Sequence, residues 1–294
     1  GMNLGADDYL TKPCSAADLL EAINSRLSKR HAIQSQTQQE LENLRSSITL
    51  ALPHELRTPL TGIVTSVELL RLLADAPTKE DLLEIADTIQ SSSQKLYRLI
   101  QNYLLYAKLE VTRCDVTLQA AFQQGAVSHP SPLVASVAEQ VARQYDRAAD
   151  LVLQLDFEQP QYVVRCAGSD LEKILLELID NAFKFSSQGS PVRVKGCVEA
   201  GFYVVEVRDM GRGMTEEHIA LLGAYMQFNR RIYEQHGVGL GFAIAKRLVE
   251  LWQGRLVLQS QPNCATVVRV SLPQVPCAQV EPNELIDYAD FQLQ

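Results

Sequence analysis

The chain has 294 residues, of which 46% are hydrophobic and 21% are charged, and 27 Lys and Arg against 35 Asp and Glu give a net charge of −8. This length corresponds to about two domains, and the apolar fraction excludes an intrinsically disordered chain. The net negative charge argues against a basic surface that would bind nucleic acid. The sequence shows neither a membrane span of about 20 apolar residues nor a signal peptide.

The first 27 residues hold too little apolar surface to fold alone. A short strand-like piece ends at Lys12 and Pro13, and Ser15 can cap a helix that reaches about Leu27. One strand and one helix cannot bury their apolar faces without help. We therefore expect this piece to be the end of a larger domain or to pack against a partner surface.

Two long antiparallel helices are predicted next. Residues 28–47 lack Gly and Pro and begin a coiled-coil-like helix, whose apolar seam recurs at steps of three and four to about Ala74. A second helix is predicted over 79–108. One apolar stripe per helix makes too small a core, so residues 48–113 are expected to pair with a second copy as a dimeric four-helix bundle.

Short apolar runs typical of strands are interleaved with helices after about Asp115. The strands are expected at 151–155, 162–166, 192–195, 202–207, 256–258 and 267–270, and the helices near 132–149, 169–185, 215–223 and 239–252. This order favours an α/β sandwich, in which helices cover one face of a mixed or antiparallel sheet. The acidic tail, residues 274–294, is expected to be loosely held.

His54 stands in the segment LPHELRTPL on the first long helix, between Pro53 and Pro59. An imidazole on a helix surface is a nucleophile near neutral pH, and another domain can reach it. Glu55 could hold or deprotonate the ring, and Thr58, about one turn further on, shares the exposed face. The alternative is a solvated histidine in a kinked helix.

Glu177, Asn181 and Lys184 fall at i, i+4 and i+7 and so share one stripe of a predicted helix. A carboxylate or amide oxygen beside a lysine can hold Mg²⁺ and phosphate. The alternative is that this stripe is the ordinary solvated face of the helix.

Asp209 follows a predicted strand and shares the face expected to be buried. A buried carboxylate needs a hydrogen-bond donor, and a purine amino group is one such partner. Gly211 and Gly213 would then let a ligand approach the backbone. The alternative is a structural aspartate before a glycine turn.

Gly237, Gly239 and Gly241 lead into a predicted helix. A glycine-rich backbone at a helix N-terminus offers free N–H groups to phosphate, although the GxGxG spacing differs from the dinucleotide fingerprint. The segment between Gly213 and Gly237, which includes Phe228, is long enough for a lid.

In this order, the four motifs resemble those of the two-component sensor histidine kinases. LPHELRTPL is similar to the phospho-acceptor box of that family, ELIDNAFKFS to its Asn box, and DMGRGM and GVGLGFAIAKRLVE to its two Gly boxes. The resemblance covers about residues 40–273. Residues 1–27 separately resemble the C-terminal strand and helix of a response-regulator receiver domain, with Lys12 and Pro13 at the matching positions.

The resemblance implies an ATP-binding domain of the histidine kinase, Hsp90 and gyrase type that phosphorylates His54. Glu55 would be the acid/base partner of the imidazole, and Thr58 would help to position water for dephosphorylation of a regulator. The reaction implied is ATP-dependent phosphorylation of His54, followed by transfer of the phosphoryl group to an Asp of a response regulator.

In the ATP-binding domain, the resemblance implies a site for ATP and Mg²⁺. Asn181 would bind the metal with Glu177 nearby, Lys184 would contact phosphate, and Asp209 would accept a hydrogen bond from the adenine amino group. Further residues implied to shape the pocket and its lid are Gly211, Gly213, Phe228, Gly237, Gly239, Leu240 and Gly241.

The domain order implied is a receiver-domain fragment (1–27), a linker helix (28–47), a dimerisation and histidine phosphotransfer domain (48–113), an ATP-binding catalytic domain (115–273) and an acidic tail (274–294). The expected partners are a second copy of the chain and a receiver domain, with neither nucleic acid nor direct membrane insertion. Six widely spaced cysteines form no metal or disulfide pattern, which favours a reducing cytoplasm.

Three other functions remain open. The chain could be a related ATPase, which would use a carboxylate to activate water and would not need His54. It could also be a kinase-inactive dimeric scaffold that binds a regulator through the bundle. A third possibility is that dephosphorylation of the regulator is the main output, in which Thr58 would take part.

Overall fold

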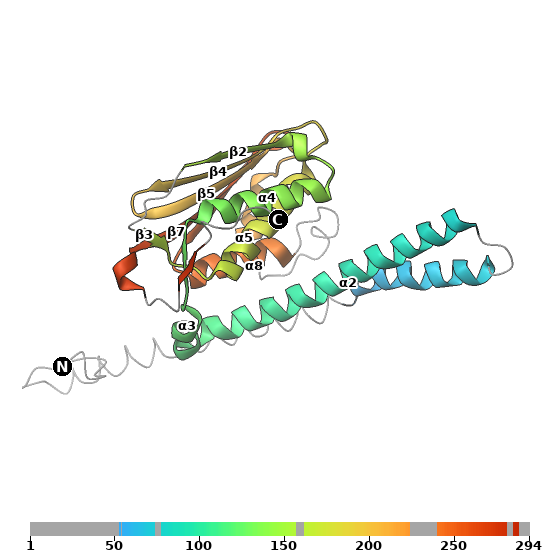
Figure 1. Ribbon diagram of the computed structural model, residues 1–294, viewed down its shortest axis with the longest axis horizontal. Coiled ribbons are helices and arrows are strands. Elements are labelled where there is room, and N and C mark those ends of the chain that lie inside the picture. The colour runs from blue at the N-terminus through green and yellow to red at the C-terminus, as the bar shows by residue number, and fades with distance from the viewer. Residues whose placement is uncertain are drawn as a thin grey trace, which may run out of the picture.

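The computed structural model describes residues 53, 55–73, 78–156, 162–223, 240–280 and 285–287. Within these ranges the chain forms a long helical hairpin and an α/β unit that lies against the second helix of the hairpin (Figure 1). The predicted receiver-domain fragment and linker helix lie outside the described residues, and so does His54.

The hairpin consists of a first helix over residues 55–72 and of α2 (Lys79–Cys114). A capping box begins α2: the Thr78 hydroxyl accepts from the Asp81 amide at 3.1 Å, and the Asp81 carboxylate accepts from the Thr78 amide at 3.0 Å. Gly62 lies directly against Ser92, so the two helices pack closely. The predicted pair of antiparallel helices is therefore confirmed over the described residues, 55–72 and 79–114.

α2 continues six residues beyond the predicted end at Lys108 because its last turns are buried against the α/β unit. Tyr106 and Leu109 are 2% and 0% exposed and belong to the same apolar cluster as the core of that unit. The Arg247 guanidinium donates to the Glu110 carboxylate at 2.5 Å and links α2 to α8 (Leu240–Leu251). The sequence pattern of α2 alone did not reveal these partners.

The α/β unit is built on an eight-stranded sheet, which confirms the predicted mixed sheet. Its strands are β1 (Ala126–Ser128), β2 (Leu151–Leu155), β3 (Tyr162–Val164), β4 (Val192–Glu199), β5 (Phe202–Asp209), β6 (Arg255–Ser260), β7 (Thr266–Pro276) and β8 (Leu285–Asp287). The strand order is β2-β4-β5-β7-β3-β1-β8, with β6 also paired to β7. The pairs β2–β4 and β1–β8 are parallel, and the other pairs are antiparallel.

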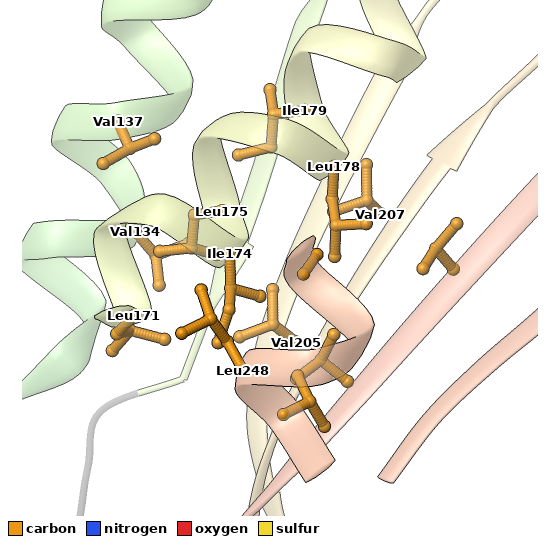
Figure 2. Close-up of a cluster of buried hydrophobic side chains, with 14 of the residues drawn as sticks. Val134, Val137, Leu171, Ile174, Leu175, Leu178, Ile179, Val205, Val207 and Leu248 are labelled. Atoms are coloured by element: carbon orange, nitrogen blue, oxygen red, sulfur yellow. The ribbon is translucent and has the colours of Figure 1, made fainter. Parts of the chain in front are cut away.

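One face of this sheet is covered by α4 (Pro130–Gln144), α5 (Gly168–Phe185) and α8, as predicted (Figure 1). Leu171, Leu175 and Leu248 meet Val205 in the core between the helices and β5 (Figure 2). Burial of each such side chain contributes about 1.5–3 kcal/mol. α5 lies at the centre of this layer, between α4 and α8, and it carries the predicted Asn box.

Two further helices lie outside this layer, and several short elements were not predicted. α3 (Val116–Phe122) follows α2 directly, and α6 (Glu216–Gly223) follows β5. The expectation of a loosely held tail is wrong for the described part of it. β7 runs to Pro276, and β8 pairs with β1, which itself was not predicted. β3 is equally short but was predicted from the apolar run at 162–166, whereas β1 and β8 stand in no run long enough to be recognised.

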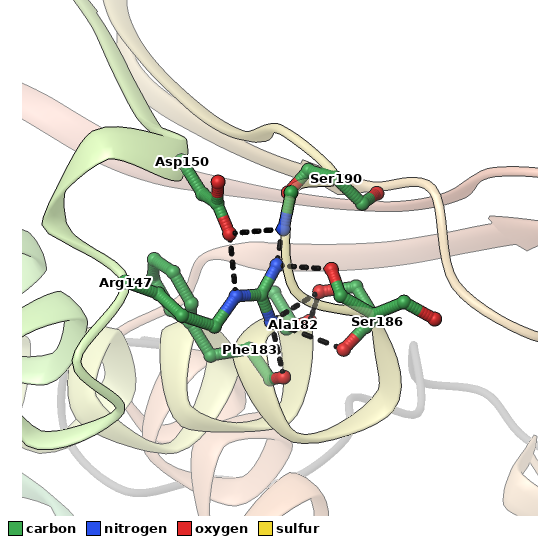
Figure 3. A network of polar contacts seen from close by, with 8 residues as sticks. Arg147, Asp150, Ala182, Phe183, Ser186 and Ser190 are labelled. Carbon is green, nitrogen blue, oxygen red and sulfur yellow. Dashed lines mark hydrogen bonds and ion pairs between the residues drawn. The ribbon is translucent and has the colours of Figure 1, made fainter.

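The C-terminal end of α5 is held by one buried guanidinium. Arg147 is 6% exposed and donates to the carbonyl oxygens of Phe183, Ser186, Ser187 and Ser190 at 2.6–3.0 Å (Figure 3). Helix ends leave carbonyl groups without intrahelical partners, and a guanidinium with five donors can satisfy several of them.

Replacing Arg147 with Met is therefore expected to lower the free energy of unfolding by about 3–5 kcal/mol, because buried carbonyl oxygens lose their donor and the Asp150 carboxylate keeps only the Gly189 amide. Urea denaturation followed by circular dichroism measures this difference. Arg143→Met is the matched control, since Arg143 is exposed and lies 4.0 Å from Glu139; it should change stability by less than about 1 kcal/mol. Equal effects of the two substitutions would contradict the role of Arg147.

Candidate functional site

The described neighbours of His54 lie on the exposed side of the first helix. Glu55 and Thr58 are both exposed there, so they do share the predicted accessible face. The Glu55 carboxylate accepts a hydrogen bond from the Tyr103 hydroxyl of α2. Burial, and then the negative charge of Glu55, raise the pKa of Tyr103, which stays a neutral donor at ordinary pH. The sequence analysis did not identify Tyr103 as a partner of Glu55.

On α5, the predicted stripe contains side chains in three different environments. Asn181 is half-buried, whereas Lys184 is exposed, with its ammonium 5.1 Å from the centre of the Phe185 ring. Glu177 is 14% exposed, and its Oε1 accepts from Lys173 Nζ at 2.6 Å and from Asn102 Nδ2 at 3.3 Å. Glu177 therefore does not lie on an ordinary solvated face of the helix.

Asp209 ends β5 and is 7% exposed, which confirms the prediction that its face is buried. Its Oδ1 accepts from the Gly211 amide at 2.8 Å, the one hydrogen bond that it makes to the described residues. Burial raises the pKa of Asp209 to about 6, and the bond from Gly211 offsets only part of this effect. A further donor at this carboxylate would stabilise its ionised form.

Gly211 and Gly213 are required by the packing of the protein itself. A Cβ at Gly211 would lie 2.3 Å from the Phe185 carbonyl oxygen, and one at Gly213 would lie 1.8 Å from the Gln261 carbonyl oxygen. Gly213 also has a φ of +63°, which favours glycine. Gly211 therefore lets the loop after β5 lie directly on the end of α5, and Gly213 lets the same loop lie on the turn between β6 and β7; the sequence did not reveal either contact.

The second glycine motif meets α5 as well. Leu240 begins α8, and a Cβ at Gly241 would lie 1.8 Å from Glu177 Oε2, so any other residue at this position would displace the carboxylate. Phe228, Gly237 and Gly239 lie outside the described residues.

Three motifs that are far apart in the sequence are thus gathered along α5. Asp209 and the glycine loop lie at its C-terminal end, and the start of α8 lies against Glu177, two turns earlier; Asn181 falls between them. The buried carboxylate can accept from a base, and the N-terminus of α8 has the dipole that favours phosphate.

The donor set fits a metal that is bound together with phosphate groups. In the described part of the chain, no cluster of three or more His, Cys, Asp or Glu side chains could hold a metal ion. Mg²⁺ is usually held by one or two protein oxygens, with phosphate oxygens and water as its other ligands. Asn181 on α5 carries an amide oxygen, which has the chemistry of such a ligand.

Two family models match the chain. The His Kinase A (phospho-acceptor) domain matches residues 44–112, and the histidine kinase-, DNA gyrase B- and HSP90-like ATPase family matches residues 167–276. The chain therefore contains a histidine kinase phospho-acceptor domain, which forms the helical hairpin, followed by an ATP-binding domain of the histidine kinase-, gyrase B- and HSP90-like type with an α/β fold. Neither match reaches residues 1–27, so the comparisons give no support for a receiver-domain fragment there.

Curated relatives agree with these matches. The chain is 30% identical over 256 residues to the signal transduction histidine-protein kinase BarA of Escherichia coli, which covers 83% of this chain and 26% of BarA. It is 27% identical over 271 residues to the histidine protein kinase DivJ of Caulobacter vibrioides, covering 91% of this chain and 44% of DivJ. The chain thus spans less than half the length of these relatives.

Solved structures show the same fold. The Acinetobacter baumannii histidine kinase AdeS superposes with a TM-score of 0.54 at 18% identity, over 75% of this chain and 97% of AdeS. Full-length ShkA, determined in complex with AMPPNP, superposes with a TM-score of 0.53 at 22% identity, over 77% of this chain and 45% of ShkA. Among the described residues, no helix has the length and apolar character needed to cross a membrane.

Proposed function

We propose that this chain binds ATP with Mg²⁺ along α5 and transfers the γ-phosphoryl group to His54. The observation that carries this proposal is the convergence of Asp209, the glycine loop and the start of α8 on one helix. The same chain carries a phospho-acceptor hairpin, which a pure ATPase would not need, whereas an inactive scaffold would not need the convergent nucleotide site. Incubation with γ-labelled ATP tests the proposal by its acid-labile product.

The chemistry follows from the residues assigned to each step. A ring nitrogen of His54 would bond to the γ-phosphorus while the bond to the β–γ bridging oxygen breaks, and ADP leaves. Glu55, held by Tyr103, would take the proton released from the ring. Bound Mg²⁺ would neutralise charge on the phosphate groups, and Lys184 would contribute a further positive charge.

Specific recognition would come from Asp209 and Asn181. The Asp209 carboxylate would accept a hydrogen bond from the adenine amino group, and Asn181 would hold the metal, with Glu177 beside it. Gly211, Gly213, Phe228, Gly237, Gly239, Leu240 and Gly241 would form the pocket wall and the lid. Catalysis of this kind depends mainly on positioning and on electrostatic stabilisation.

Dimerisation through the hairpin is part of the same proposal. Large apolar side chains remain exposed on both helices, more than a monomeric hairpin is expected to leave in water. They include Leu60, Val64, Val67, Leu72, Leu82, Leu83, Tyr97, Ile100 and Leu104. A second copy would bury this surface in a four-helix bundle.

Replacing Val64 with Asp is expected to shift the chain from dimer to monomer, because the charge would be buried in the bundle. Light scattering after size-exclusion chromatography gives the mass. Thr65→Asp is the control, because it places the same charge at an exposed residue about 100° around the helix from Val64, and it should leave the dimer intact. A Val64→Asp protein that remains dimeric would place the dimer interface elsewhere.

Several finer assignments belong to this proposal. The phosphoryl group would pass to an Asp on the receiver domain of a response regulator, and Thr58 would position water when the regulator is dephosphorylated. Residues 1–27 would be the C-terminal piece of a receiver domain, an assignment that rests on Lys12 and Pro13. The reaction would take place in the cytoplasm, where ATP and regulators are available.

A further inference from the structure

A polar contact joins the hairpin to the Asn box of the ATP-binding unit. Asn102 of α2 is 9% exposed and lies between two side chains of α5. Its Oδ1 accepts from Lys173 Nζ at 2.7 Å, and its Nδ2 donates to Glu177 Oε1 at 3.3 Å. Lys173 also donates to Glu177 Oε1 at 2.6 Å, so the three side chains form a closed triangle across the two units.

This triangle encloses the Glu177 carboxylate. Oε1 accepts two hydrogen bonds, one of them from an ammonium group, and Oε2 lies against the backbone of Gly241. A carboxylate oxygen offers about two lone-pair directions, and both directions of Oε1 are in use. A metal ion near Glu177 would also meet the positive charge of Lys173, and like charges repel at short range.

The position of Lys173 depends on Asn102. The lysine side chain is 24% exposed, and a lysine of the free ATP-binding unit could turn its ammonium toward water. With α2 in place, the Asn102 amide oxygen supplies a second acceptor beside Glu177 and keeps the ammonium over the carboxylate. The contact of Asn102 with Lys173 therefore exists only when the hairpin and the ATP-binding unit are docked.

We propose that Asn102 acts as a latch: in the docked arrangement it keeps Lys173 on Glu177, and so withholds this carboxylate from the Mg²⁺ of a bound nucleotide. Docking of the hairpin at this contact and binding of the metal–nucleotide then oppose each other, as thermodynamic linkage requires. This inference rests on the proposed function, since it assigns regulation to the proposed nucleotide site.

The test is the affinity of the full chain for ADP, measured by calorimetry with Mg²⁺ and with EDTA. Charge-assisted hydrogen bonds of this kind contribute enough that Asn102→Ala should bind ADP about three- to tenfold more tightly with Mg²⁺. Affinity in EDTA should stay the same. Hydrogen exchange of the nucleotide-free protein should rise in α5 around Lys173, a readout independent of activity.

Two further variants separate the latch from general loosening of the contact. Arg98→Ala removes another link between α2 and α5, the 3.8 Å pair with Asp180, without touching Glu177, and should not alter ADP affinity. Lys173→Met should tighten Mg²⁺-dependent binding by itself and should abolish any further effect of Asn102→Ala, because the latch acts through the ammonium. If Asn102→Ala does not fold, Lys173→Met carries the test.

Unchanged or weaker Mg²⁺-dependent binding in these variants, with a wild type that binds ADP, would overturn the latch and leave the proposed function intact. Tighter binding in EDTA as well would also overturn it, because the effect would then not concern the metal. A wild type that binds no ADP would remove both proposals.

Discussion

His54→Gln is expected to abolish the incorporation of label from γ-labelled ATP, while ATP binding is retained. Gln matches the imidazole in polarity and approximate size but has no nucleophilic nitrogen, so the bond to phosphorus cannot form. The wild-type product should be labile in acid and stable in base, as expected of a phosphoramidate. The loss of label should be complete, because the variant has no other atom in the position of the acceptor nitrogen.

The parallel measurement of nucleotide affinity gives this experiment its control. Equal ADP affinity of the wild type and of His54→Gln would show that the α5 site is intact, so that the lost label reports the acceptor alone. Label retained in His54→Gln would remove the assignment of His54. Nucleotide binding without any label in the wild type would favour the scaffold or a regulator phosphatase.

Asp209→Asn is expected to weaken nucleotide binding by about ten- to a hundredfold at pH 7.5, because a hydrogen bond to a charged acceptor contributes roughly 1.5–3 kcal/mol. The Asn side chain keeps the shape of the site and an oxygen that can accept from the Gly211 amide. It loses the negative charge that would face the adenine amino group. Calorimetric titration with ADP measures the change, and unchanged affinity would remove the adenine role.

The pH dependence of binding gives a second, independent signature of Asp209. Burial raises the pKa of Asp209 from 3.8 to about 6. A hydrogen bond from the adenine amino group would favour the ionised carboxylate. Below pH 6, nucleotide binding would therefore release the proton of Asp209. Wild-type affinity should therefore fall as the pH is lowered through 6, by up to about tenfold per unit. The ADP phosphates titrate equally in both proteins, so a steeper fall in the wild type than in Asp209→Asn isolates the carboxylate.

The same substitution should make the nucleotide-free protein more stable. A carboxyl with a raised pKa binds its proton more tightly in the folded state than in the unfolded chain, so the ionised group lowers stability as the pH rises from about 4 to 6. Above pH 6, Asp209→Asn should increase the free energy of unfolding by up to about 3 kcal/mol. If Asp209 is kept for nucleotide binding, Asp209→Asn should therefore be more stable than the wild type and bind nucleotide less tightly.

How much of this protein follows from sequence differs between its parts. The long helices, the order of the main strands and the burial of Asp209 were predicted correctly, because periods of 3.6 and 2 are local properties of the chain. The short strands β1 and β8 were not predicted, whereas the equally short β3 was, because β3 belongs to a longer apolar run at 162–166. The extension of α2 to Cys114 was missed because the partners of its last turns lie on α8.

The site shows the same division. The sequence alone predicts candidate residues from their chemistry: a nucleophile at His54, a polar stripe on one helix, a carboxylate on a buried face and glycines before a helix. Local spacing determines these features, because each depends on residues within one or two turns of one another.

Only the tertiary structure decided how these residues meet. Packing of α8 and of the loop after β5 onto α5 brings Gly241 to Glu177 and Gly211 to Phe185, contacts that join residues distant in sequence. The contacts of Asn102 with Lys173 and of Tyr103 with Glu55 likewise cross between helices. No local pattern encodes such pairs, because a side chain acquires its partner, its burial and its pKa only when separate elements pack together.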